Sequence, residues 1–218
     1  MGLDPKILRE RLGELKSLDS ELKIFGANGH RYRLNPPLTA SKVAAVEKKY
    51  AMRLPEDYRR FILEVANGGA GPYYGVFKLG QQDDVYGYRS WEGGFLLGDP
   101  SKPFAHRKAW NLSEELWAQE PDVEGMSEDE EEKALEKWDA RLEKEYWNPK
   151  IMDGAIPICH IGCALRQWLI VTGPEAGRVW QDDRADNAGL RPLDRTFAEW
   201  YMGWLDTSLR SIPRRHRS

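Results

Sequence analysis

Cys159, His160 and Cys163 have the residue types and the close spacing of metal ligands, because thiolates and imidazoles bind soft metal ions. A closed zinc site needs a fourth ligand, and the sequence has no second C-x-x-C or H-x-x-x-H pattern. If the segment is a strand, Cys159 and His160 also point to opposite faces. We therefore expect buried free thiols at a hairpin and no metal site.

A glycine-rich segment, NGGAGPYYG at residues 67–75, has the composition of a phosphate-binding loop. A Walker loop also needs Lys-Ser or Lys-Thr after its last glycine and then a helix, and a dinucleotide fingerprint needs a preceding strand. Here a helical pattern precedes the glycines and a strand-like pattern follows them. We interpret the glycines as a helix end and a sharp turn.

Three carboxylates, Asp182, Asp183 and Asp186, follow a strand-like run and are the candidates for acid–base catalysis. Their closeness to Arg184 favours a turn with local ion pairs. No G-x-S-x-G pattern is present, and the four histidines lie in dissimilar contexts. We predict a protein without catalytic activity; a carboxylate-dependent enzyme is the alternative.

The strongest charge pattern is an acidic block at residues 120–145, where twelve acidic and four basic side chains give a net charge of −8. A solvated helix face, a calcium site and a docking surface for a basic protein are the three interpretations. The D-x-[DN]-x-[DN]-G spacing of a calcium loop is absent, which disfavours the second. For the third, the candidate partner-binding residues are Glu128, Asp129, Glu130, Glu131, Glu132, Glu136 and Asp139.

Composition places the chain among folded proteins: it has 218 residues, of which 41% are hydrophobic, and a formal net charge of −3. No apolar run approaches the ~20 residues of a membrane span, and the N-terminus lacks the apolar region of a secretory signal. Two cysteines and no global positive charge favour a cytoplasmic protein that binds neither membranes nor nucleic acid directly.

Local signals predict helices followed by strands and a last helix. Asp4 and Pro5 begin the first helix, which we expect to run to Gly26; further helices begin after Thr39, at Pro55 and, with a capping box, after Ser127. Strands are expected at residues 30–34, 72–79, 155–161, 165–171 and 177–182, and a wide apolar face marks a helix at residues 197–209. This order predicts an α+β fold.

At residues 54–79, LPEDYRRFILEVANGGAGPYYGVFKL, together with VAAVEKKY just upstream, the sequence resembles the SUKH superfamily, which includes the yeast Smi/Knr cell-wall regulators and many bacterial immunity proteins. The later stretches GCALRQWLIVTGPEAGRVWQDDR and TFAEWYMGWLD continue the resemblance. The signature positions, whose role we expect to be mainly structural, are Glu47, Leu54, Pro55, Tyr58, Phe61, Asn67, Gly68, Gly69, Gly71, Pro72, Tyr74, Gly75, Gly177, Trp180, Asp182 and Trp200.

The resemblance implies a curved antiparallel sheet with helices packed on one side, without catalysis or cofactor. The corresponding division is an N-terminal helix (residues 1–30), a SUKH-like domain (31–212) with an acidic helical insertion at about 114–147, and a basic tail (213–218). Bacterial members are implied to be cytoplasmic antitoxins that bind a toxin domain, often a nuclease. The dense acidic side chains of the insertion could then mimic nucleic acid and occlude the phosphate-binding site of a basic toxin. A regulatory scaffold of the yeast type is the alternative.

Overall fold

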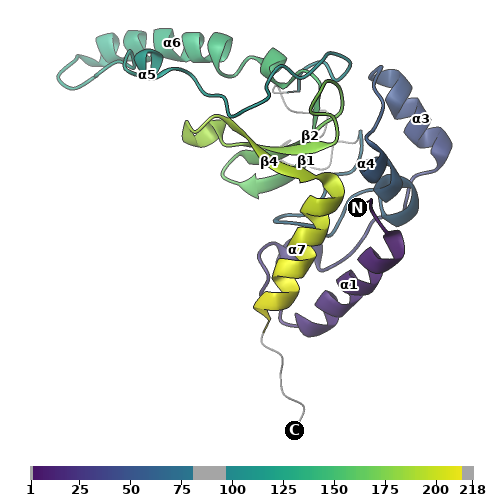
Figure 1. Cartoon of the computed structure of the whole chain (residues 1–218). Coiled ribbons are helices and arrows are strands. Elements are labelled where there is room, and N and C mark those ends of the chain that lie inside the picture. Colours follow the sequence, from purple (N-terminus) through teal and green to yellow (C-terminus); the bar gives the residue numbers. More distant parts are fainter. Residues whose placement is uncertain (1, 81–96, 213–218) are drawn as a thin grey trace.

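The computed structural model describes residues 2–80 and 97–212, and their helices and sheet confirm the α+β fold class. Figure 1 shows the sheet at the centre of the molecule, with α7 and α1 on one side and α6 extending away from it. The helices are α1 (Pro5–Leu18), α2 (Ala27–His30), α3 (Ala40–Lys49), α4 (Glu56–Arg60), α5 (Glu114–Trp117), α6 (Glu128–Glu145) and α7 (Phe197–Ser211). Shorter helical turns are η1 (Phe61–Val65), η2 (Pro149–Met152) and η3 (Arg184–Asp186).

The sheet is an antiparallel meander in the order β1 (Ala155–Gly162), β2 (Leu165–Ile170), β3 (Arg178–Asp182) and β4 (Leu190–Thr196). Register shifts interrupt the β1–β2 and β3–β4 pairings, and such irregularities bend a sheet. Each long edge is partly covered: Phe77 donates its N–H to the Ile158 carbonyl at 2.9 Å beside β1, and Trp110 bridges to Leu190 beside β4.

One face of the sheet and the helices share the larger core. Tyr58 and Phe61 lie with their rings 4.9 and 5.2 Å from the ring of Phe197 in α7. Tyr201, one turn further along α7, donates its hydroxyl hydrogen to the Ala70 carbonyl at 2.7 Å. The helix thus joins the sheet to the glycine turn that follows η1.

The opposite face of the sheet has a second, smaller core. Alternation along the strands points Trp168, Ile170 and Trp180 away from α7. Phe104 and Met152, from irregular chain and from η2, cover them. Both faces of the sheet are therefore covered, which explains why the second half of β2, Trp168–Ile170, is apolar and buried at every position.

Several local predictions are confirmed and three are wrong. Asp4 caps α1, Thr39 caps α3, and Ser127 with Glu130 forms the predicted capping box of α6. The first helix, however, ends at Leu18 instead of Gly26, because the Asp19 carboxylate accepts the N–H groups of the next turn. Within residues 30–34 and 72–79, Leu34 and Val76 form isolated bridges in place of strands, and His30 ends α2. The strand β4 was not predicted.

The acidic insertion is a projecting arm made of α5 and α6 (Figure 1). Trp138 is 6% exposed because it packs edge-on against Trp117 of α5, at 6.1 Å between ring centroids. Leu135, three residues before Trp138 on the same helix, is 37% exposed. Within residues 2–80 and 97–212, α5 is the helix that packs beside α6, and part of the apolar face of α6 stays exposed.

Among residues 2–80 and 97–212 no helix has both the length and the apolarity to cross a bilayer. The basic tail at residues 213–218 lies outside the described residues.

Candidate binding surfaces

The cysteine–histidine cluster does not form a metal site in the described part of the chain. Cys159 is buried and Cys163 is exposed, both as free thiols, and no three His, Cys, Asp or Glu side chains there converge on a common point. Burial raises the pKa of the Cys159 thiol far above its usual range, and its Sγ donates to the Pro72 carbonyl at 3.2 Å. The expected burial is thus confirmed for Cys159, a neutral core residue, and is wrong for Cys163, which lies exposed in the turn between β1 and β2.

Asp182 and Arg184 form a buried ion pair below the sheet. The guanidinium donates through Nε to Oδ1 and through Nη2 to Oδ2 of Asp182, each at 2.8 Å, and the Arg184 side chain is fully buried. Trp168 Nε1 donates a further hydrogen bond to Oδ2 at 3.2 Å. Both oxygens of the Asp182 carboxylate thus accept hydrogen bonds within the core, so we interpret the pair as a structural contact and not as an acid–base group.

The same arginine holds the base of the arm. Its Nη1 donates to the carbonyl of Tyr146, the residue that ends α6, at 2.9 Å, and its guanidinium lies 5.4 Å from the ring of Trp147. The Tyr146 hydroxyl in turn accepts the N–H of Gly189 at 3.0 Å. The arm is therefore anchored to β3 and to the loop before β4.

The other two candidate acids differ in surroundings. Asp183 accepts from Arg191 Nε at 3.0 Å and from Gln181 Nε2 at 2.7 Å. Asp186 lies at the end of η3, in a turn that Asn187 completes with a left-handed backbone. The expected turn with local ion pairs is present, and the carboxylates do not converge on a common point.

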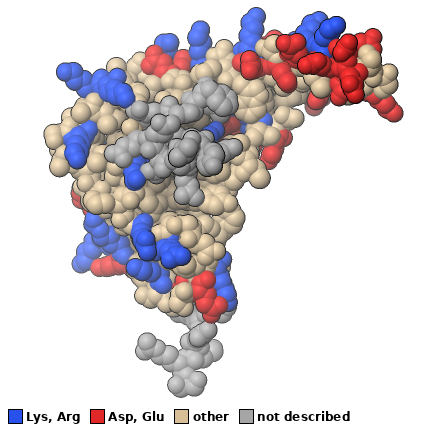
Figure 2. Space-filling view, turned by 180° about the vertical axis from the view of Figure 1, so that it is seen from behind, with Lys and Arg blue, Asp and Glu red and all other residues tan. Residues whose placement is uncertain are grey.

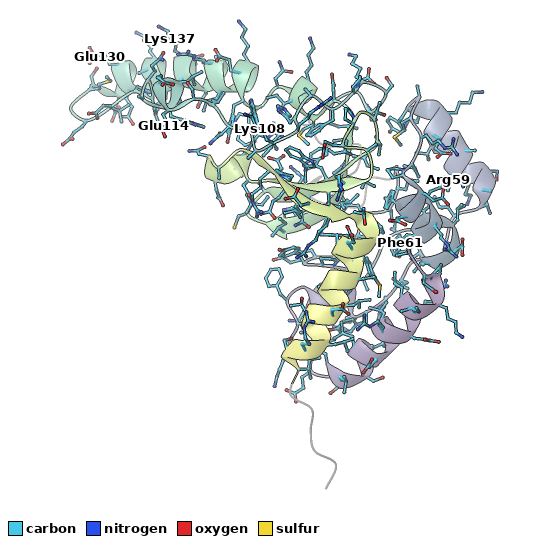
Figure 3. All side chains as sticks on the ribbon, viewed as in Figure 1. Arg59, Phe61, Lys108, Glu114, Glu130 and Lys137 are labelled. Atoms are coloured by element: carbon cyan, nitrogen blue, oxygen red, sulfur yellow. The ribbon has the colours of Figure 1, made fainter. Side chains whose placement is uncertain are left out.

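Charge on α6 is sorted into two stripes. At 100° per residue, five acids spaced by three or four residues share one side of the helix, and four bases share the neighbouring side. The acidic stripe is Glu128, Glu132, Glu136, Asp139 and Glu143, and all five are exposed. The basic stripe is Lys133, Lys137, Arg141 and Lys144. Figure 2 shows the acidic side chains gathered on the arm, and Figure 3 shows Glu130 near its tip and Lys137 further along α6.

The structure separates the seven predicted partner-binding acids into groups. Glu128, Glu132, Glu136 and Asp139 belong to the acidic stripe, and Asp129 lies at its border. Glu131 lies outside the stripe, towards the apolar side of the helix, and is half-buried. Glu130 instead accepts the N–H and hydroxyl of Ser127, which holds its pKa below the usual value. Its first role is thus to cap the helix.

The signature glycines allow chain segments to approach closely. Gly68, Gly69 and Gly75 have φ values of 75°, 110° and 96°, and a Cβ on any of them would lie 2.4–2.6 Å from a backbone oxygen. A Cβ on Gly71 would lie 2.8 Å from Val76 Cγ2. Any other residue at these positions would separate the turn from the chain beside it.

The remaining signature residues support the same framework. Glu47 accepts the Leu54 N–H at 3.0 Å, and Asn67 accepts the Leu79 N–H at 2.8 Å, so two turns are fixed by buried or half-buried polar groups. Trp200 donates from Nε1 to Gln167 Oε1 at 2.9 Å. Leu54, Tyr58, Phe61 and Trp180 are core residues, Pro55 precedes α4, Gly177 precedes β3, and Pro72 and Tyr74 lie in the loop beside β1.

These positions are the ones in which the sequence resembles SUKH proteins. Residues 37–203 match the model of the SMI1/KNR4 family (SUKH-1). The chain belongs to this family. Comparison with curated proteins and with solved structures gave no significant match.

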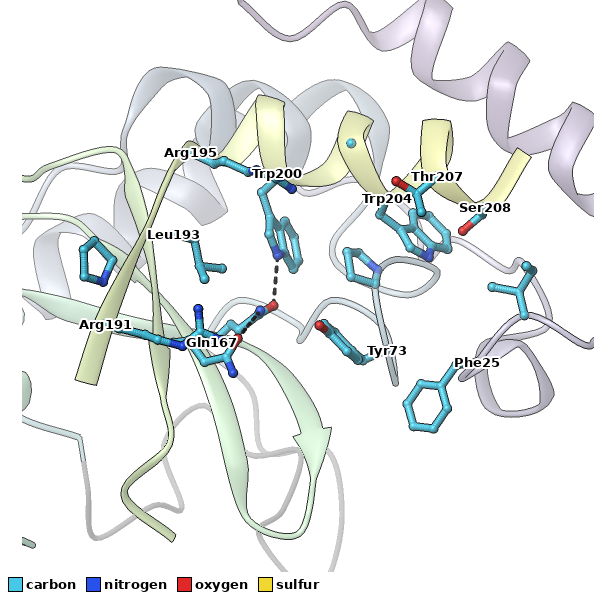
Figure 4. Close-up of a pocket in the computed structure, with 15 residues that line it drawn as sticks. Phe25, Tyr73, Gln167, Arg191, Leu193, Arg195, Trp200, Trp204, Thr207 and Ser208 are labelled. Carbon is cyan, nitrogen blue, oxygen red and sulfur yellow. Dashed lines mark hydrogen bonds between the residues drawn. The ribbon is translucent and has the colours of Figure 1, made fainter. Parts of the chain in front are cut away.

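This SUKH protein also has a groove that the sequence analysis missed. The groove has a volume of about 580 Å³ and lies between α7, the strands β2–β4 and the loops that contain Phe25 and Tyr73 (Figure 4). Arg191 and Arg195 stand at one end and Phe25 at the other. A second face on α7, with Gly203, Trp204 and Thr207, was a signal that could have indicated one wall, whereas β4 has no regular alternation of apolar and polar residues.

Proposed function

We propose that this SUKH protein is a non-enzymatic, cytoplasmic immunity protein that binds and neutralises a basic toxin domain through the acidic stripe of its arm. Membership in the SUKH family supports a role in binding another protein. The exposed acidic stripe is the main observation that favours a basic partner. A nuclease toxin fits this charge, because a site that holds phosphates is itself basic.

Charge sorting on α6 supports binding over mere solvation. The acidic stripe places like charges four residues apart, as at Glu128 and Glu132 or Glu132 and Glu136, and each such pair destabilises a helix by about 0.2–0.5 kcal/mol. A helix that needs only solubility would alternate the signs. The acidic stripe therefore lowers the stability of α6 and concentrates negative potential on one side of this projecting helix.

Apolar groups beside the stripe add contact area. Leu135 and Met126 are 37% and 42% exposed, and Leu135 precedes Asp139 by one helical turn. Charged rims around a few exposed apolar side chains are typical of protein interfaces. Trp138 of the same helix is buried against Trp117 and does not contribute to this surface.

The experiment measures binding of one quadruple and one triple variant of the arm to the purified product of an adjacent toxin-like gene. In the first, Glu128, Glu132 and Glu136 become Gln and Asp139 becomes Asn; Glu130 is kept because it caps α6. At about 0.2–1 kcal/mol for each exposed ion pair, affinity should fall about fourfold to several hundredfold at low salt.

The matched control changes Lys133, Lys137 and Lys144 to Gln on the adjacent stripe, and it should leave affinity unchanged or raise it. Circular dichroism should show intact helix in both variants. Equal affinity of the acid-neutralised variant, or continued killing by the co-expressed toxin with no complex formed, contradicts the proposal. Binding to signalling or wall-synthesis proteins in place of a toxin would favour the regulatory scaffold.

A further inference from the structure

The groove beside α7 combines a polar floor with one charged and one aromatic end. Trp200 donates to Gln167 Oε1, Gln167 Nε2 donates to Gln181 Oε1 at 3.2 Å, and Gln181 Nε2 donates to Asp183. Each amide nitrogen has two N–H groups and uses one in this chain. The floor is therefore held rigid by its own hydrogen bonds and still has donors to offer.

Arg195 supplies free positive charge at one end of the groove. Its side chain is exposed and makes no ion pair or hydrogen bond with any residue in 2–80 or 97–212, whereas Arg191 beside it is paired with Asp183. The Arg195 guanidinium extends across α7 at Gly203, where an added Cβ would lie 3.4 Å from Nη1. The glycine costs a helix interior about 1 kcal/mol relative to alanine, and it keeps this end of the groove open.

Aromatic side chains line the rest of the groove. Phe25 is 59% exposed and lies 6.1 Å from the Tyr73 ring, and Trp204 follows Trp200 by one turn of α7 (Figure 4). The Trp204 indole N–H has no hydrogen-bond acceptor within the described ranges, so it is available to a ligand. Gly26 fixes this end, because its φ of 81° brings it against the Tyr73 carbonyl.

The adjacent strand edge does not favour pairing with another strand. Trp110 already bridges to Leu190, Pro192 has no N–H to donate, and Asp194 has a φ of 53° next to the register shift. A partner at this face must therefore bind through side chains and the floor amides.

We propose that the groove binds an extended segment of a partner protein that has an acidic side chain, placed at Arg195, and an aromatic or large aliphatic side chain, placed between Trp204 and Phe25. Charge complementarity selects the acid, and the exposed aromatic rings select the apolar residue. The volume of about 580 Å³ accommodates a few residues of such a segment. This site is separate from the arm and does not depend on the proposed function.

The test is selection of a random-peptide phage library on the immobilised full chain, followed by fluorescence anisotropy with the enriched peptides. Enriched sequences should pair Asp or Glu with a nearby aromatic or large aliphatic residue. Arg195→Glu should weaken their binding by about tenfold or more at low salt. Gly203→Leu should abolish binding by filling the groove, without lowering the melting temperature, because leucine favours the helix.

Lys150→Glu is the control, since it reverses an exposed charge on η2, outside the groove. It should leave peptide binding unchanged. Enrichment of basic peptides, an absence of enriched sequences, or binding that survives both Arg195→Glu and Gly203→Leu would overturn the proposal.

Discussion

Arg184 offers a quantitative test of how the arm is attached. Replacing it with methionine removes two charge-assisted hydrogen bonds to Asp182 and one to the Tyr146 carbonyl, and it leaves the buried carboxylate without its counter-charge. Breaking a buried pair in this way costs about 3–5 kcal/mol. With a urea m-value of about 2 kcal/mol/M, the unfolding midpoint should fall by about 1.5–2.5 M.

The double variant Asp182→Asn with Arg184→Met separates the charge effect from lost packing. The asparagine oxygen can still accept from Trp168 Nε1, and no buried charge remains unpaired. We expect the double variant to be more stable than Arg184→Met alone by about 2 kcal/mol. Both variants should also speed tryptic cleavage in α6, because Arg184 no longer holds the carbonyl that ends this helix.

Two results would refute this reasoning. If Arg184→Met lowered the free energy of unfolding by less than about 1 kcal/mol, the pair would contribute as little as a surface ion pair does. If the double variant were no more stable than the single one, the cost would arise from packing rather than from an unpaired carboxylate.

Three further changes should give distinct results. Burial lowers the pKa of His30 to about 4 from 6.5, so between these pH values the unfolded chain binds a proton there that the folded chain does not. As the pH falls from 6.5 to 4, the free energy of unfolding measured in urea should therefore fall by about 1–3 kcal/mol, and His30→Gln should weaken this pH dependence. Tyr201→Phe removes the hydrogen bond to the Ala70 carbonyl and should cost about 1–2 kcal/mol by the same assay, whereas an unchanged midpoint would show that water replaces the hydroxyl. Trp138→Ala should increase hydrogen exchange in the arm through loss of contact with Trp117 and leave the main unfolding transition nearly unchanged; a large shift in that transition would mean that the arm folds with the body.

Short-range signals in the sequence located most of the helices. Capping residues such as Asp4, Thr39 and Ser127 satisfy N–H groups within three positions, so their effect does not depend on the rest of the molecule. Alternation of apolar and polar residues was less reliable, because it predicted strands at residues 30–34 and 72–79 that the structure does not contain. There the glycine turn brings distant backbone segments together, and isolated bridges replace a continuous ladder.

Sequence alone determined the family signature, three of the five predicted strands (β1, β2 and β3) and the acidic character of α6, because these depend on residue order and helical or strand periodicity. Tertiary structure decided that Leu135, beside the acidic stripe, is exposed. It also decided that Arg184 connects Asp182 of β3 to Tyr146 at the base of the arm. It also assembled the groove, whose walls come from the loop at Phe25, from β4 and from α7. No local pattern can bring such separated segments together; only the packing of α7 across the sheet does so.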